Sequence, residues 1–393
     1  MSMSLRIAHV ISADMGVRFI LLHQLLFLKS EGYEVTAVCS PGKWIKDIED
    51  AGISVKTIAI TRNLHPYKDI VSLWRLFRYF RTQRFDLVHT HTPKAGFVGR
   101  IAARLAGIPL IVHTNPGFYF HKNSGFFSRR FYVLLEKIAA SCCDLILSQN
   151  SEDVETAIHE RICQASKIRR LGNGIDVSRF NPDQYSSDRI LAKKKELGIP
   201  PASRVVGLIG RLVREKGFVE FLKAARIVGE AIPDIKFLAA GPIEPEKFDQ
   251  IQPGIVKQLG LENHVILLAE MRTDIPDLLA LMDIVTLPSY REGMPRLPME
   301  AGLMRKPVVT TNIRGCREVI EDGRTGILVP ARDSAALAKA IIYLLENPEK
   351  AGQMGIDAQS RIKTQFDERQ MFKRIISAYR DIGSAKGLHG TNL

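Results

Sequence analysis

Two glutamates flank a break in the stretch SYREGMPRLPMEAGLM, residues 289–304. Pro295 and Pro298 predict a helix start between them, because proline has no backbone N–H and is tolerated only in the first helical turn. Glu292 would then lie in the loop before the helix, near the reacting end of a ligand. Glu300 would lie in or near the first turn, within reach of a vicinal diol such as a ribose. The backbone N–H groups expected to bind phosphate or sugar oxygens belong to Gly293, Met294 and Leu297.

Each carboxylate also has an interpretation without a ligand. Glu300 would merely complement the helix dipole, and Glu292 would be solvated. The position of both beside a loop glycine favours a binding site.

A second stretch, GRLVREKG from Gly210 to Gly217, supplies two cations to a loop that opens a helix. Arg211 and Lys216, together with backbone N–H groups at a helix N-terminus, suit a diphosphate. The stretch lacks the GxxxxGK[ST] pattern of a P-loop, so the alternative is a solvated basic loop.

Histidines gather at the ends of two apolar runs in the first half of the chain. His89, His91 and Lys94 lie in LVHTHTPKAG, and His113 and His121 lie in IVHTNPGFYFH. His91 and Lys94 are candidates for a loop that faces acceptor and donor. A histidine at a strand end is often only a structural residue. Zinc has poor support, because no HExxH motif occurs and no carboxylate has ligand spacing to these residues.

Gly16 lies in ADMGVR, directly after the first apolar run, where it would let the backbone approach a ligand. The stretch is not GxGxxG, so a dinucleotide site has little support. GNGID, from Gly172 to Asp176, is a turn by composition.

Short β-branched runs alternate with helix-length amphipathic stretches, which predicts parallel sheets with helices on both faces. Polar residues 175–203 interrupt the alternation and predict the junction of two doubly wound α/β domains, 1–180 and 181–367. Ligands bind beyond the carboxyl ends of such strands, so two facing domains would form a cleft. The expected strands are 5–12, 33–40, 55–60, 86–91, 109–114 and 144–149, then 205–210, 235–241, 264–269, 283–288, 307–311 and 326–330.

The formal charge of +13 is concentrated in the first half: Lys56 to Lys137 hold 14 Lys/Arg against three acids. This asymmetry indicates an anionic partner, whether nucleic acid, an anionic membrane surface or phosphorylated substrates. No run is long enough to span a membrane, and no secretory signal is recognised. The five cysteines form no CxxC pair and are expected to be free thiols in a cytosolic protein.

Five motifs together resemble the retaining glycosyltransferases of family 4, whose GT-B fold has two Rossmann-like domains facing across a cleft. The motifs are the E-x7-E pair from Glu292 to Glu300, GRLVREKG, DIPDLLALMDIVTLPSYREGMPR, RGCREVIEDGRTGILVP and NGIDVSRFNP. The stretch VHTHTPKAGFVGRIAARLAGIPLIVHT resembles a subgroup that builds bacterial capsule, exopolysaccharide or O-antigen repeat units. The resemblance extends from Leu5 to about Ile382.

For the second domain, the resemblance implies a nucleotide-sugar site. Arg211 and Lys216 would hold the donor diphosphate, and Glu300 would bind the ribose hydroxyls. Glu292 would be catalytic, beside the donor sugar. The backbone from Gly293 to Pro295 would contact sugar and phosphate.

For the first domain, the resemblance implies acceptor binding. His113 would contact the donor sugar and support the reaction centre. Gly16 would lie near the donor phosphate and the acceptor. The last helix, at about 368–385, would cross back onto this domain.

The chain departs from the family pattern in three places. Glu270 stands where the family often has a small residue near the base pocket, Gly302 stands where a bulkier residue is usual, and ADMGVR has one glycine where many members have two. These differences concern nucleotide preference and acceptor fit more than the reaction type.

The expected reaction transfers a hexosyl or N-acetylhexosaminyl group from a nucleotide diphosphate sugar, preferentially a UDP-sugar, with the anomeric configuration retained. Arg211, Lys216 and the helix N-terminus would stabilise the developing phosphate charge, and no metal or other cofactor is expected. The acceptor proton would pass to a leaving-group oxygen on the same face, or Glu292 would form a covalent intermediate. Both routes stay open.

The expected acceptor is a saccharide on a polyprenyl diphosphate, which predicts a cytoplasmic protein bound peripherally to the inner membrane face. The basic stretches WRLFRYFRTQRF and FFSRRFYVLLEK suit an anionic lipid surface. Alternatively, Trp74, Phe77 and Phe80 are ordinary core contacts.

Two other functions fit parts of the pattern. One is a non-hydrolysing nucleotide-sugar 2-epimerase of the same fold. The other is a basic-surface binding protein without catalysis, although no helix-turn-helix, RNP or zinc-finger signature supports nucleic acid as its partner.

Overall fold

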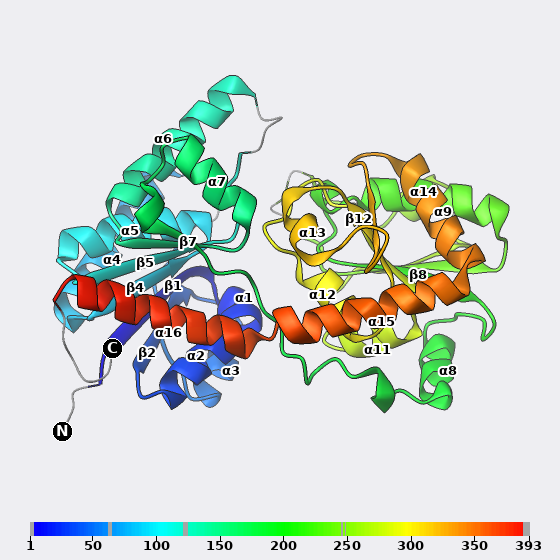
Figure 1. Cartoon of the computed structure of the whole chain (residues 1–393), viewed down its shortest axis with the longest axis horizontal. Coiled ribbons are helices and arrows are strands. Elements are labelled where there is room, and N and C mark those ends of the chain that lie inside the picture. Colours follow the sequence, from blue (N-terminus) through cyan, green and yellow to red (C-terminus); the bar gives the residue numbers. More distant parts are fainter. Residues whose placement is uncertain (1–3, 62–64, 121–124, 245–246, 248, 388–393) are drawn as a thin grey trace. The chain divides into compact units, whose positions relative to one another are not determined.

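The computed structural model describes residues 4–61, 65–120, 125–244, 247 and 249–387, and its contacts divide the chain into two compact units (Figure 1). Unit 1 comprises Met1–Asn173 and Arg369–Leu393, and unit 2 comprises Gly174–Glu368. The chain therefore passes from one unit to the other twice. The first passage, at 173/174, precedes the boundary that the sequence predicted at 180/181.

Unit 1 is built on a seven-stranded sheet in the order β3-β2-β1-β4-β5-β6-β7, with every neighbouring pair parallel. The order is doubly wound and reverses direction between β1 and β4. The strands are β1 Arg6–Ala13, β2 Glu34–Ser40, β3 Ser54–Thr57, β4 Leu87–His91, β5 Leu110–Asn115, β6 Leu145–Ser148 and β7 Ile168–Arg170.

Helices cover both faces of this sheet. They are α1 Asp14–Gly16, the π-helix Val17–Leu21, α2 Leu22–Ser30, α3 Ile45–Asp50, α4 Pro66–Gln83, α5 Pro93–Ala106, α6 Phe126–Ser141, α7 Ser151–His159 and α16 Glu368–Ala385, with a 3-10 turn at Ala165–Lys167. One core cluster joins the sheet to α2, α3 and α16. The other joins the opposite face to α4, α5, α6 and α7, so the final helix is an integral layer of unit 1 (Figure 1).

Unit 2 repeats the same strand order in a six-stranded parallel sheet, β10-β9-β8-β11-β12-β13, which reverses between β8 and β11. Its strands are β8 Arg204–Ile209, β9 Ile235–Ala240, β10 Val265–Leu268, β11 Ile284–Leu287, β12 Val308–Thr311 and β13 Ile327–Val329. Its helices are α8 Ser187–Glu196, α9 Phe218–Ala231, α10 Ile255–Gln258, α11 Ile275–Leu281, α12 Arg296–Leu303, α13 Arg314–Val319, α14 Ser334–Glu346 and α15 Pro348–Gln365, with 3-10 turns at Pro182–Gln184 and Arg214–Lys216.

The predicted fold class, two Rossmann-like units with a returning C-terminal helix, is confirmed. Each predicted strand is present, because strands covered on both faces by helices read as continuous apolar runs. The sequence missed β7, whose residues Arg169 and Arg170 are exposed. It also read residues 175–203 as a junction, whereas Ile175, Phe180 and Ile199 are buried in the core of unit 2.

Within the described part of the chain, no helix combines the length and the apolar character needed to cross a bilayer.

Candidate active site

The loops after β8 and β11 meet at the point where the strand order of unit 2 reverses. Such reversal points are where open α/β sheets bind ligands. Gly217 lies at the end of the first loop with φ +77°, and a Cβ there would stand 2.1 Å from the carbonyl oxygen of Pro288 in the second. Glycine is therefore required for the two loops to approach each other.

Lys216 and Glu292 form an ion pair across this meeting point. The Lys216 Nζ to Glu292 Oε1 distance is 2.5 Å, and the two side chains are only 19% and 11% exposed. The buried hydroxyl of Ser289 donates to the same Oε1 at 2.7 Å. The structure thus brings together the predicted diphosphate-binding lysine and the predicted catalytic carboxylate, with each charge held in place by the other.

Arg211 follows β8 in the same loop. Its Nη1 donates to Glu244 Oε2 at 2.8 Å, and Glu244 is a neighbour that the sequence reading did not single out. Burial works against the charged guanidinium, but the Glu244 carboxylate raises the pKa of Arg211 overall, so the side chain stays cationic. A second positive group therefore lies on the loop that leads to Lys216.

Helix α12 begins at Arg296, between the two prolines, as predicted. Leu297 and Met294 are buried apolar side chains of the unit 2 core, so their contribution to a ligand is limited to backbone N–H groups. Pro295 is the N-cap and Pro298 lies within the first turn. The first turn holds no acidic residue, so Glu300 is placed in the following turn.

Glu300 is the acid of α12. Burial raises the pKa of its carboxyl above the ordinary value, while Arg296 and Arg179 oppose the shift. Among the described residues, none donates a hydrogen bond to this carboxylate. Its oxygens remain available as acceptors, the property that binding a vicinal diol requires.

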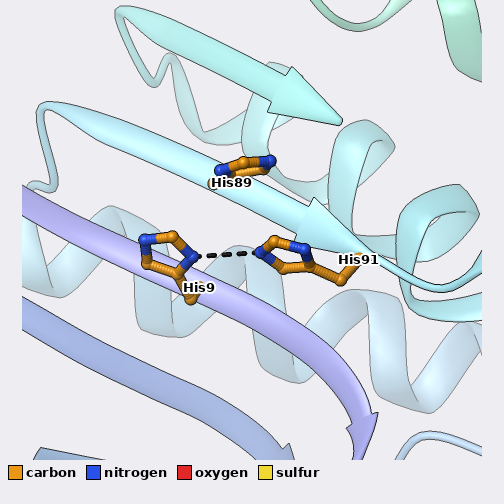
Figure 2. A group of neighbouring side chains, drawn as sticks. All are labelled: His9, His89 and His91. Carbon is orange, nitrogen blue, oxygen red and sulfur yellow. Dashed lines mark hydrogen bonds between the residues drawn. The ribbon is translucent and has the colours of Figure 1, made fainter. Parts of the chain in front are cut away.

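Unit 1 holds a buried polar cluster at the centre of its sheet (Figure 2). His9 Nδ1 and His91 Nε2 are 3.0 Å apart and share a hydrogen bond between nearly parallel rings. His89 bonds the hydroxyl of Tyr379 through Nδ1 at 2.6 Å and the hydroxyl of Thr114 through Nε2 at 2.7 Å. The cluster joins β1, β4, β5 and α16.

Burial lowers the pKa of each histidine in this cluster: that of His91 to about 3, and those of His9 and His89 well below 6.5. All three are neutral at physiological pH. Their ring nitrogens lie within 4.8 Å of one another, a spacing open to a metal ion. However, both nitrogens of His89 are engaged by hydroxyls, so the residues fit a hydrogen-bonded network better than a metal site.

His113, the predicted catalytic residue of unit 1, is fixed and neutral. Its Nδ1 is 2.9 Å from the hydroxyl of Thr90 and 3.1 Å from the Thr90 carbonyl oxygen. The ring packs on the backbone of Gly96, where a Cβ would stand 2.4 Å from Cε1. Burial is the main cause that lowers the pKa of His113, and the nearby Arg100 guanidinium adds to it. Nδ1 is committed to Thr90, so Nε2 is the atom left for a ligand.

The remaining candidates of unit 1 are engaged in packing. Lys94 is buried and forms an ion pair with Asp69. His91 is held by His9, as described above. Gly16 adopts a helical φ of −66°, and a Cβ there would stand 2.6 Å from Ile11 Cδ1, so close packing accounts for the glycine. His121 lies outside the described residues.

Two parallel doubly wound sheets, with a cation–carboxylate pair on the loops at the reversal point of the second, are typical of proteins that bind nucleotides. Residues 16–174 match the "Glycosyl transferase 4-like domain" family and residues 190–361 match "Glycosyl transferases group 1". The chain is 30% identical to UDP-Gal:alpha-D-GlcNAc-diphosphoundecaprenol alpha-1,3-galactosyltransferase of Escherichia coli, covering 96% of this chain and 97% of that one.

Two further proteins are similar to this chain and support the same family. The capsular polysaccharide biosynthesis glycosyltransferase CapM of Staphylococcus aureus is 26% identical, covering 95% of this chain and 96% of that protein. HepE of Anabaena, solved with UDP and glucose, superimposes with a TM-score of 0.81 at 22% identity, over 96% of this chain and 100% of that one, a likeness of fold. The chain belongs to the group 1 glycosyltransferases, with a 4-like N-terminal domain. The prediction of a glycosyltransferase is confirmed.

Ser289 is expected to act as a positioning residue for Glu292. Hydrogen bonds to charged groups contribute about 1.5–3 kcal/mol, so Ser289→Ala should lower kcat roughly 10- to 100-fold with little change in the donor KM. Ser289→Thr, which keeps a hydroxyl, should recover part of the loss. Steady-state kinetics on both variants measure the split between kcat and KM.

The matched control is Ser203→Ala, the same change at another buried serine of unit 2. It should leave kcat unaltered. Equal losses in kcat for the two alanine variants, together with equal falls in thermal midpoint, would make Ser289 a packing residue.

Proposed function

We propose that this protein is a retaining glycosyltransferase that moves a hexose or N-acetylhexosamine from a UDP-sugar to a lipid-linked saccharide in the synthesis of a bacterial surface polysaccharide. The observation that carries the proposal is the Lys216–Glu292 pair at the reversal point of unit 2, inside the matched glycosyltransferase family region. The two relatives support it, since one is named for UDP-Gal and a diphosphoundecaprenol-linked acceptor and the other for capsular polysaccharide biosynthesis.

In this proposal, the donor diphosphate lies between the loop of Arg211 and Lys216 and the start of α12. The reaction breaks the bond between the anomeric carbon and the diphosphate oxygen, and negative charge grows on that oxygen. The two cations and the backbone N–H groups of Gly293, Met294 and Leu297 stabilise that charge. No metal ion is required for this step.

Glu300 accepts hydrogen bonds from the ribose hydroxyls. Glu292 stands beside the sugar, and binding of the diphosphate by Lys216 releases its carboxylate toward the anomeric carbon. The acceptor proton passes either to the leaving oxygen on the same face, or to a base after Glu292 has formed a covalent intermediate. Both routes retain the anomeric configuration.

In unit 1, His113 contacts the donor sugar through Nε2. The connections that follow β1 and β4 border the acceptor and the donor phosphate, and Gly16, His91 and Lys94 support these connections through the contacts described above. The protein acts in the cytoplasm, bound peripherally to the membrane that carries its acceptor.

The test is a calorimetric titration with UDP-, GDP- and dTDP-sugars, using wild-type protein, Glu300→Ala and Lys216→Ala. One UDP-sugar should bind in the micromolar range, and both variants should lose most of that binding. Glu230→Ala, an exposed glutamate on α9, is the control and should bind normally. Absence of binding by every donor would reject the proposed function.

The donor affinity should also depend on pH through Glu300. The carboxylate accepts the ribose hydroxyls, and its pKa is raised by burial, so affinity should fall on acidification at a higher pH than an ordinary glutamate would give. Glu300→Gln should bind weakly with no such dependence. If the donor affinity of the wild-type protein does not change down to pH 4.5, Glu300 does not bind the ribose.

A further inference from the structure

Helix α6 exposes an apolar stripe on the side opposite its core face. Val133 and Ala140 are the residues that it buries against the sheet. The exposed residues recur at intervals of four, three and four positions, which places them in one row along the helix. This α6 stripe consists of Phe127, Phe131, Leu134 and Ile138, and Phe127 is 87% exposed.

Helix α4 carries a second exposed row. The α4 stripe consists of Tyr67, Ile70 and Trp74, and Trp74 is 54% exposed. Phe80 is fully buried, so the core interpretation of WRLFRYFRTQRF holds for that residue and not for Trp74. Both α4 and α6 pack against α5 on the same face of the unit 1 sheet, so the two helices that carry the stripes are neighbours of one helix (Figure 1).

The charges on these three helices are one-sided. Their acids are Asp69 and Glu136, and each is committed to a buried cation: Asp69 to Lys94 and Glu136 to Arg100. Arginines and lysines therefore dominate the outward side. The exposed cations are Lys68, Arg75, Arg78, Arg81, Arg104 and Arg130.

Two of these cations lie over aromatic rings at the surface. The guanidinium of Arg78 is 5.6 Å from the centre of the Trp74 ring, and that of Arg130 is 5.3 Å from the Phe126 ring. Aromatic rings beside cationic heads suit the boundary between acyl chains and anionic headgroups.

We infer that the α4 stripe, the α6 stripe and the cations around them form one docking surface for an anionic lipid bilayer. The inference rests on the proposed function, since a lipid-linked acceptor must be reached at a membrane. The positive charge of this surface favours an anionic bilayer as its binding partner. A second copy would oppose the same cations to themselves across a two-fold interface, which is unfavourable.

The experiment measures sedimentation of the full-length protein with vesicles of phosphatidylcholine alone and of an equal mixture with phosphatidylglycerol. Wild type should bind the mixed vesicles, lose most binding at high salt, and bind phosphatidylcholine weakly. Phe127→Ser with Phe131→Ser should weaken binding at least about tenfold. Arg75→Glu with Arg78→Glu should weaken it by roughly 25-fold or more, at about fivefold for each cation lost.

Matched controls sit on unit 2. Ile356→Ser removes an exposed apolar side chain of α15, and Lys195→Glu reverses an exposed cation of α8. Both should bind like wild type, and circular dichroism should show all variants folded. Since the substituted residues are exposed, the fold should be retained.

Three results would overturn the inference. The first is wild-type protein that binds neither vesicle. The second is stripe variants that bind as tightly as the controls. The third is a wild-type dimer in solution that Phe127→Ser with Phe131→Ser converts to a monomer, which would assign the surface to a second copy. The UDP-sugar titration is run separately on the same samples, so failure of the proposed function and failure of the docking surface give different results.

Discussion

Replacing Lys216 with alanine is expected to lower kcat/KM about 10²- to 10³-fold. Removing one preorganised charged donor from a developing oxyanion commonly has an effect of this size. The variant also leaves Glu292 with Ser289 as its remaining hydrogen-bond partner among the described residues, so the carboxylate loses the cation that orients it. Initial rates with the donor found by titration measure the loss.

Two comparisons separate chemistry from folding. Lys223→Ala changes an exposed lysine on α9, a few residues along the chain, and should retain full activity. Lys216→Arg keeps the charge but not the compact ammonium group, so it should recover part of the rate. A Lys216→Ala enzyme within about threefold of wild type would show that the ion pair is structural and not part of the diphosphate site.

Unit 1 is expected to unfold in mild acid while unit 2 remains folded. Burial lowers the pKa of four histidines in unit 1: His9, His89, His91 and His113. In mild acid these side chains are therefore protonated in the unfolded state but not in the folded state. The contribution of these neutral histidines to the stability of unit 1 is complete above about pH 6.5, the pKa of histidine in the unfolded chain. It is lost as the pH falls below that value. Below that pH, each histidine lowers the stability by about 1.4 kcal/mol per pH unit, so the four together lower it by roughly 5 kcal/mol for each pH unit. This is comparable with a whole domain's stability of about 5–15 kcal/mol.

The chain provides its own reporter for this transition. Both tryptophans, Trp44 and Trp74, lie in unit 1, whereas the one histidine in unit 2 is His264. Tryptophan fluorescence should therefore change between pH 6.5 and 4.5, before the far-UV circular dichroism signal is fully lost. Coincident loss of both signals, or fluorescence unchanged to pH 4, would contradict the prediction.

A pair of variants assigns the acid sensitivity to the cluster. His9→Leu removes one buried titratable group whose Nε2 has no hydrogen-bond partner among the described residues. It should reduce the slope of unfolding free energy against pH by about 1.4 kcal/mol per unit. His159→Leu changes a histidine that is 85% exposed and should leave the slope unaltered. Urea unfolding at several pH values, followed by tryptophan fluorescence, measures the slopes.

The sheets were predictable because their strands are buried on both faces and carry a local apolar signal. The start of α12 was predictable for a similar reason, since Pro295 and Pro298 restrict the backbone locally. β7 was not predictable, because Ile168 is its one buried residue. The sequence did not show that residues 175–199 belong to unit 2, because most of them are polar. Three apolar side chains among them pack into the core of that unit: Ile175, Phe180 and Ile199.

The partners of the site residues were beyond the sequence. Spacing identified Lys216 and Glu292, but their mutual pairing depends on two loops that the strand order brings together. Ser289 and Glu244 have no motif of their own. Tyr379 bonds His89 from 290 positions away, and the sequence carries no local sign of that contact. Lys94 looked available to a ligand because nothing in the sequence shows that Asp69, 25 positions earlier, pairs with it.

The contact between His89 and Tyr379 also sets the order of events during biosynthesis. When β4 leaves the ribosome, the helix that covers its face has not yet been made. At about 5–20 residues per second, the intervening 290 residues take roughly 15–60 s to synthesise. During that interval unit 2 is synthesised, while the part of the unit 1 sheet that α16 covers stays exposed beside α2 and α3. The core of unit 1 is therefore completed after that of unit 2, although unit 1 is translated first.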